Sequence, residues 1–127
     1  IKEGSPYVTP DGRTIANELL TTPADPSVSY AYCSDTVYDE RVAKSVEGVH
    51  TLYHEATYTS EYADKAHGRG HSTAAEAARI ARLAGARQLV LGHFSKRYTD
   101  EAGHLEEAQA IFPDTIIASE GMKLNLL

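Results

Sequence analysis

Hydrophobic residues gather in short runs along this chain, and longer polar segments separate the runs. Residues 28–33 are rich in valine and tyrosine at alternating positions, which is typical of a strand. Three further apolar runs cover residues 49–53, 88–91 and 115–118. We predict a strand at each of these four places.

Helical patterns occupy the gaps between the predicted strands. Residues 39–46 carry apolar side chains four positions apart, which predicts a short helix. Residues 73–83 are dense in alanine, follow a Ser-Thr cap and end before Gly85, so the clearest helix is expected there. A third helix is predicted over residues 100–110, and Pro113 closes it off.

Strands that alternate with helices through short loops predict an α/β fold in which helices cover a sheet. The turn-rich residues 1–26 are expected to form an edge segment, and residues 119–127 a further edge piece. Residues 57–70 lack a clear period, which predicts a loop with at most one helical turn. We expect one domain over residues 1–127.

Composition narrows the class of protein. The 127 residues are 42% hydrophobic, enough for a core, and carry a net charge of −6, which argues against general affinity for nucleic acid. A single cysteine, Cys33, excludes an internal disulfide and favours a reducing cytoplasm. No run approaches the length of a membrane span, and the start has no signal peptide. The absence of an initial methionine suggests that upstream sequence was removed.

Polar residues with metal-binding chemistry stand where predicted strands end. Asp35, His54 and His93 all hold such positions, and ligand sites of α/β sheets gather beyond the carboxyl ends of strands. Carboxylate oxygen and imidazole nitrogen bind first-row metals, so Asp35 and His93 are the best ligand candidates. Taken alone, Asp35 also fits a turn after a strand, and His93 a packed histidine.

A second possible pair is Glu55 and His71. A carboxylate can hold a neighbouring imidazole in one tautomer and raise its basicity for proton transfer. The HEAT sequence at 54–57 lacks the second histidine of an HExxH zinc motif, so that alternative fails. Taken alone, His71 is also compatible with a plain residue ahead of a helix cap.

Side chains that can donate hydrogen bonds follow His93 in the sequence. Ser95, Lys96 and Arg97 suit an anionic substrate, because arginine binds phosphate in bidentate fashion, although an ordinary polar loop is the alternative. The other histidines have neither strand-end placement nor an acidic partner, and we expect surface or packing residues: His50, His67 and His104.

Four motifs in order carry a resemblance to a known family: YCSDT (32–36), LYHEATY (52–58), GHSTAAEAARIARLAGA (70–86) and LVLGHFSKRY (89–98). They closely resemble ribonuclease Z, a zinc-dependent endonuclease of the metallo-β-lactamase superfamily that matures transfer RNA 3′ ends. The resemblance implies the carboxyl-terminal lobe of an αββα sandwich.

The resemblance also implies roles for single residues. Asp35 matches the aspartate that bridges two zinc ions, and His93 matches a histidine that completes the shell of one ion. Glu55 and His71 match the pair thought to protonate the departing 3′ oxygen, while His54 orients its neighbours. The two ions would supply a hydroxide nucleophile and stabilise charge growing on phosphorus.

Substrate and assembly follow from the same resemblance. Ser95 and Arg97 match a loop that lies against substrate phosphate, so precursor tRNA is the implied partner, with removal of its 3′ trailer as the reaction. The family forms homodimers, and bare apolar surface on a single lobe would favour self-association.

The sequence also departs from the family pattern. The ligand motif HxHxDH, one further histidine ligand and the aspartate taken as general base are absent, as is the basic arm that grips tRNA. The chain therefore resembles the carboxyl-terminal half, and we expect the fragment alone to be inactive with weak or no zinc binding. Alternatives are another metallo-β-lactamase phosphodiesterase, an arylsulfatase-like hydrolase, or a non-catalytic binding or dimerisation module.

Overall fold

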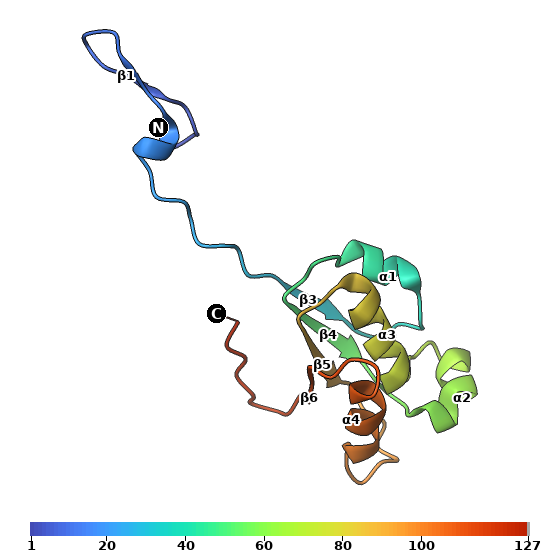
Figure 1. Ribbon diagram of the computed structural model, residues 1–127. Helices are drawn as coiled ribbons and strands as arrows, with labels where there is room; N and C mark the ends of the chain where they lie inside the picture. The colour runs from blue at the N-terminus through green and yellow to red at the C-terminus, as the bar shows by residue number, and fades with distance from the viewer. Residues whose placement is uncertain (127) are drawn as a thin grey trace.

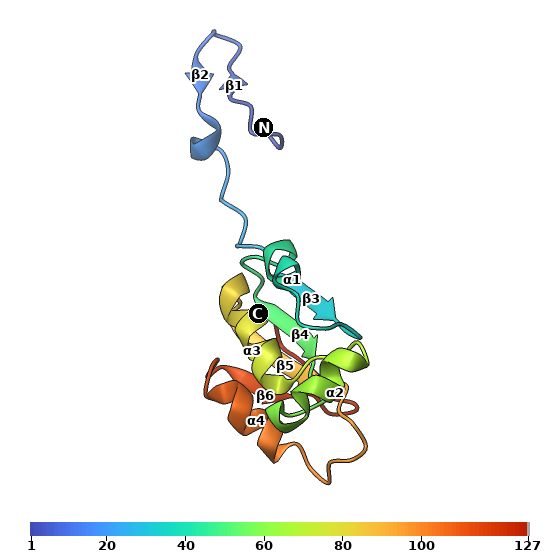
Figure 2. The ribbon, with the colours of Figure 1, turned by 90° about the vertical axis from the view of Figure 1, so that its right-hand side faces the viewer.

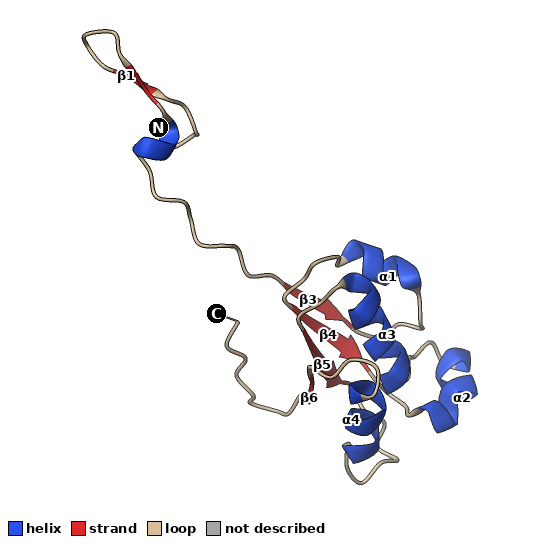
Figure 3. Cartoon of the chain, in the orientation of Figure 1, coloured by secondary structure: helices blue, strands red, loops and turns tan. Residues whose placement is uncertain are grey.

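A four-stranded parallel sheet forms the centre of the computed structural model, which describes residues 1–126 (Figures 1 and 3). The strands are β3 (Tyr30–Cys33), β4 (Thr51–Glu55), β5 (Gln88–Gly92) and β6 (Thr115–Ile117), and they lie in the order β3-β4-β5-β6. All four predicted strands are confirmed, with shifts of one or two residues at their ends.

Helices cover one face of this sheet (Figure 2). Helix α1 (Glu40–Ser45) joins β3 to β4, α2 (Ala63–Gly68) and α3 (Ala74–Ala84) join β4 to β5, and α4 (Ala102–Gln109) joins β5 to β6. Crossovers between parallel strands are right-handed almost without exception. Since each strand adds on the same side of the last one, α1, α3 and α4 fall on the same face.

Helix α3 is fixed at both ends by its own sequence. Thr73 accepts a hydrogen bond from the Glu76 backbone N–H, and the Glu76 carboxylate accepts one from Thr73, which makes a capping box. Gly85 ends the helix with φ +65°, a left-handed conformation that glycine adopts without strain. The alanines between them are buried, which lets the helix approach Leu52 and Leu89 of the sheet closely.

Within residues 1–126, no helix lies over the opposite face of the sheet. Tyr30 and Tyr32 of β3 are 46% and 65% exposed, and Tyr32 stacks on Tyr53 of β4 with ring centroids 4.6 Å apart. Parallel sheets are normally covered on both faces. This tyrosine-rich face is therefore a surface on which further protein is expected to pack.

The prediction of edge segments at both ends of the chain is wrong. Strands β1 (Tyr7–Val8) and β2 (Thr14–Ile15) pair only with each other, and Figure 1 shows this hairpin apart from the sheet. A short 3-10 helix, Asn17–Leu19, follows it. The hairpin turn satisfies its polar groups locally, because the Thr9 N–H donates to the Arg13 carbonyl at 2.8 Å. Residues 119–126 form no strand.

The predicted loop over residues 57–70 holds more helix than expected. A 3-10 turn, Ser60–Tyr62, leads directly into α2. The sequence offers no apolar period there because α2 buries only Ala66 among its residues. Nowhere in the described residues is a helix long and apolar enough to cross a membrane.

His104 of α4 is a packing residue, as one of the two expected alternatives has it. Its ring is fully buried and lies edge-on to Phe94 at 4.9 Å and Tyr98 at 4.4 Å. Burial lowers the pKa of His104 from its usual value of 6.5, and interaction with the Thr57 backbone opposes this only in part. Neither ring nitrogen has a hydrogen bond of ordinary length.

A pH dependence of stability follows from this depressed pKa. The unfolded chain binds a proton on His104 more readily than the folded one. The contribution of His104 to stability is therefore fully present above about pH 6.5 and is lost as the pH falls through the pKa of the folded state. We expect His104→Phe to raise the unfolding free energy at pH 7 by roughly 1 kcal/mol and to flatten its decline below pH 6.5. Urea titrations at several pH values measure this, and an unchanged slope would contradict it.

Candidate metal centre

Four side chains meet at the carboxyl edge of the sheet. Asp35 follows β3, Glu55 ends β4, His71 precedes α3 and His93 follows β5. Each offers a ligand atom within 4.8 Å of the others. Parallel strands bring their carboxyl ends to one edge, which explains how residues so far apart in sequence converge.

Asp35 and His93 share an unusual backbone conformation. They have φ values of +52° and +59°, and among the described residues they are the two non-glycine positions with positive φ. This region costs a residue with a Cβ about 1 kcal/mol or more and persists where the surroundings impose it. In both cases it turns the chain sharply just beyond a strand.

Glu55 is fully buried and accepts five hydrogen bonds. Its Oε1 accepts from the Thr36 N–H at 3.0 Å and from His71 Nδ1 at 2.8 Å. Its Oε2 accepts from the Ser72 N–H, the Thr57 N–H and the Thr57 hydroxyl at 3.1, 3.1 and 2.7 Å. Both oxygens are committed to these donors, so Glu55 orients its neighbours and has no free position for a metal.

The same contacts set the charge of this carboxyl. Burial by itself would raise the pKa of Glu55, but hydrogen bonds from Thr57, His71 and Ser72 outweigh burial and hold it below its ordinary value of 4.5. Glu55 is therefore ionised at neutral pH and can only accept hydrogen bonds. It follows that His71 carries its proton on Nδ1 and turns Nε2 away from Glu55.

Thr57 links Glu55 to His93 and orients the His93 ring. The Thr57 hydroxyl gives its single proton to Glu55, so it accepts from His93 Nδ1, which lies 2.9 Å away. In the neutral ring, this contact places the His93 proton on Nδ1 and the lone pair on Nε2. A hydrogen bond to one imidazole nitrogen commonly prepares the other as a metal ligand in this way.

Asp35 and His93 fit a metal ion by geometry and chemistry. His93 Nε2 lies 3.1 Å from Asp35 Oδ1, and the Asp35 side chain is 69% exposed. Two ligands bound at about 2.1 Å to one ion lie roughly this far apart. His71 Nδ1 lies farther from Asp35, at 4.0 Å, and is already bonded to Glu55.

The predicted phosphate-binding residues lie on the loop after His93. The Arg97 backbone N–H lies 3.5 Å from the Ser95 hydroxyl, a long contact. The Arg97 guanidinium is exposed and lies over aromatic rings, 4.4 Å from the centre of Tyr62 and 5.4 Å from that of Tyr58. The Ser95 N–H donates to the Thr57 carbonyl at 3.0 Å, which ties this loop to the end of β4, and binding of phosphate by the two residues stays a prediction.

Two other histidines differ in their surroundings. His67 has an acidic partner that the sequence analysis did not expect, since its Nε2 lies 2.5 Å from Glu76 Oε1. The pair is nine residues apart, and the turn between α2 and α3 brings it together. His54 is buried, and its Nδ1 bonds to the Glu55 carbonyl at 2.8 Å.

The sequence is similar to that of known proteins, although no protein-family model matches it. Ribonuclease Z of Bacteroides fragilis strain ATCC 25285 is 53% identical over 126 residues, and that of Porphyromonas gingivalis strain W83 is equally similar. The chain is a relative of ribonuclease Z. The match covers 99% of this chain and 41% of each of these ribonuclease Z proteins, where it corresponds to the carboxyl-terminal part.

Solved structures agree with this relationship. Human tRNase Z, short form, superposes with a TM-score of 0.55 at 35% identity, over 75% of this chain and 31% of the human one. A metallo-β-lactamase-fold protein of Bacillus subtilis gives 0.64 at 26% identity, over 72% of this chain and 37% of its own. The predicted fold class, an α/β lobe of metallo-β-lactamase type, is confirmed.

Proposed function

We propose that this chain supplies part of the active site of a metal-dependent endoribonuclease that removes the 3′ trailer of precursor tRNA. One observation carries the proposal, namely the meeting of Asp35, Glu55, His71 and His93 within 4.8 Å in a chain 53% identical to ribonuclease Z. The chain spans less than half the length of these relatives, so further ligands would come from outside it.

Asp35 and His93 would hold the metal, with zinc as the ion and two ions in the whole enzyme. When bound, such ions activate water at neutral pH and stabilise the charge that develops on a phosphoryl group. Thr57 keeps His93 Nε2 free for this purpose. The Asp35 carboxylate is largely exposed, which supports a role in which it would contact both ions.

Glu55 and His71 would act on the proton of the leaving group. Glu55 holds His71 by Nδ1, which leaves Nε2 to donate a proton to the departing 3′ oxygen. Ser95 and Arg97, on the loop after His93, would bind the adjoining phosphate of the substrate.

A chimaera tests this function directly. The chain replaces the matching region of the Bacteroides fragilis ribonuclease Z, and cleavage of precursor tRNA is compared with cleavage of a small phosphodiester. We expect trailer removal with metal present and loss of activity after chelation. Folded, metal-loaded chimaera that cleaves only the small diester would reject the proposal.

The chain on its own should bind zinc weakly. Two ligands leave most of the coordination shell to water, so micromolar or tighter binding is not expected. Isothermal titration with zinc at pH 7 measures this, and His93→Asn should remove what binding remains. Tight stoichiometric binding together with precursor cleavage by the 127-residue chain would contradict the expectation.

The location and assembly of the whole protein are part of the same proposal. A cytoplasmic location is supported by the single, half-buried thiol of Cys33. The bare face with Tyr30, Tyr32 and Tyr53 supports packing of further protein on the sheet, as in a sandwich. We propose that the complete enzyme forms a homodimer.

A further inference from the structure

Arg97 is held in an uncommon way for a surface arginine. Its guanidinium lies over the faces of Tyr62 and Tyr58, and no carboxylate in the described part of the chain pairs with it. Arg13 and Arg41, by contrast, each bond to a nearby aspartate. Stacking fixes the plane of Arg97 but leaves its N–H donors free for a ligand.

Other cations gather around the same rings. Lys65 Nζ lies 5.8 Å from the centre of the Tyr62 ring, and Arg69 reaches the Tyr58 hydroxyl at 3.5 Å. Like charges repel when nothing neutralises them. Three cations around two tyrosines, in a chain of net charge −6, indicate an anionic ligand at this place.

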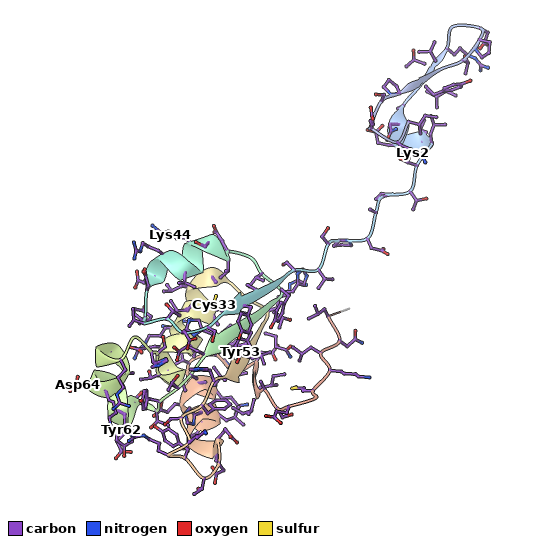
Figure 4. All side chains as sticks on the ribbon, turned by 180° about the vertical axis from the view of Figure 1, so that it is seen from behind. Lys2, Cys33, Lys44, Tyr53, Tyr62 and Asp64 are labelled. Carbon is purple, nitrogen blue, oxygen red and sulfur yellow. The ribbon has the colours of Figure 1, made fainter. Side chains whose placement is uncertain are left out.

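Tyr62 is the accessible member of this group. Tyr58 is 3% exposed and its backbone joins the start of α3, whereas Tyr62 is partly exposed at the end of a short 3-10 turn (Figure 4). The Tyr62 ring also lies edge-on to Tyr98 at 6.4 Å, which supports its orientation. Its substitution should therefore leave the fold intact while it frees Arg97.

We infer that Tyr62 is a positioning residue that presents the Arg97 guanidinium to a phosphodiester of RNA. The inference rests on the proposed function and adds to it the side chain that orders the phosphate contact. The aromatic face is the active feature, so phenylalanine can replace Tyr62 and an aliphatic residue cannot. The ring acts through Arg97 and does not itself bind a base.

Nuclear magnetic resonance of the 127-residue chain tests this, with the dinucleotide UpU as the phosphodiester probe. In Tyr62→Leu we expect the Arg97 Nε–H signal to lose its ring-current shift and UpU binding to weaken roughly 2- to 5-fold. Tyr62→Phe should keep both. In an Arg97→Gln background, Tyr62→Leu should have no further effect.

The possible failures are distinguishable. Unchanged binding in Tyr62→Leu, with weaker binding in Arg97→Gln, would overturn the positioning role but leave the proposed phosphate contact standing. Weakening by Tyr62→Leu in the Arg97→Gln background would show a ring that binds RNA directly, which also overturns it. If Arg97→Gln binds UpU with the affinity of the wild type, the proposed phosphate contact is wrong as well.

Discussion

Replacing Glu55 by glutamine should destabilise the fold more than any other single polar substitution at the site. A glutamine amide donates where the carboxylate accepts, so it would face one or more of the donors from Thr36, Thr57 and Ser72 without a bond. Unsatisfied buried groups cost about 1–3 kcal/mol each, and we expect a total loss of roughly 2–4 kcal/mol. Urea denaturation followed by far-ultraviolet circular dichroism measures this.

Glu76→Gln is the matched control. Glu76 is also nearly buried, at 7% exposure, but its bond to the Thr73 N–H belongs to a capping box that glutamine can maintain. Its other partner, His67, is 52% exposed, so water can replace that contact. The same chemical change should therefore lower stability by less than about 1 kcal/mol there. Equal losses in the two variants would mean that the network around Glu55 has no special role in the fold.

The sequence predicts the sheet domain well because its signals are local. Alanine density, the Thr73 cap and Gly85 specify α3 without reference to the rest of the chain. The prediction for the two terminal segments is wrong because their structure depends on signals that are not local. Proline and Asp-Gly turns mark breaks in the chain, but whether a short extended piece joins the sheet or pairs with itself depends on contacts between distant residues.

The candidate site is predictable as far as strand ends reveal it. Asp35 and His93 follow apolar runs, and parallel strands must bring such positions together. The part played by Thr57 was not predicted, because threonine after a strand suggests nothing by itself. Its hydroxyl acquires a role only when the fold sets Glu55 on one side and His93 on the other.

The largest expected effect on activity comes from His71→Asn in the ribonuclease Z chimaera. Asparagine can still bond to Glu55 but cannot transfer a proton, so the leaving oxygen must depart without one. Proton transfer by a positioned side chain contributes about 10²–10⁴-fold, and we expect kcat for precursor tRNA to fall by that factor. Metal content should stay at the wild-type level, because His71 is held by Glu55 and is not among the proposed ligands.

Two comparisons separate this role from metal binding and from general damage. His93→Asn should lose metal and activity together, since it removes a proposed ligand nitrogen. His50→Asn should keep kcat, because His50 bonds to Ser29 just before β4 begins, at the opposite end of that strand from Glu55. If His71→Asn loses metal in proportion to activity, His71 is a ligand and its assignment to proton transfer is wrong.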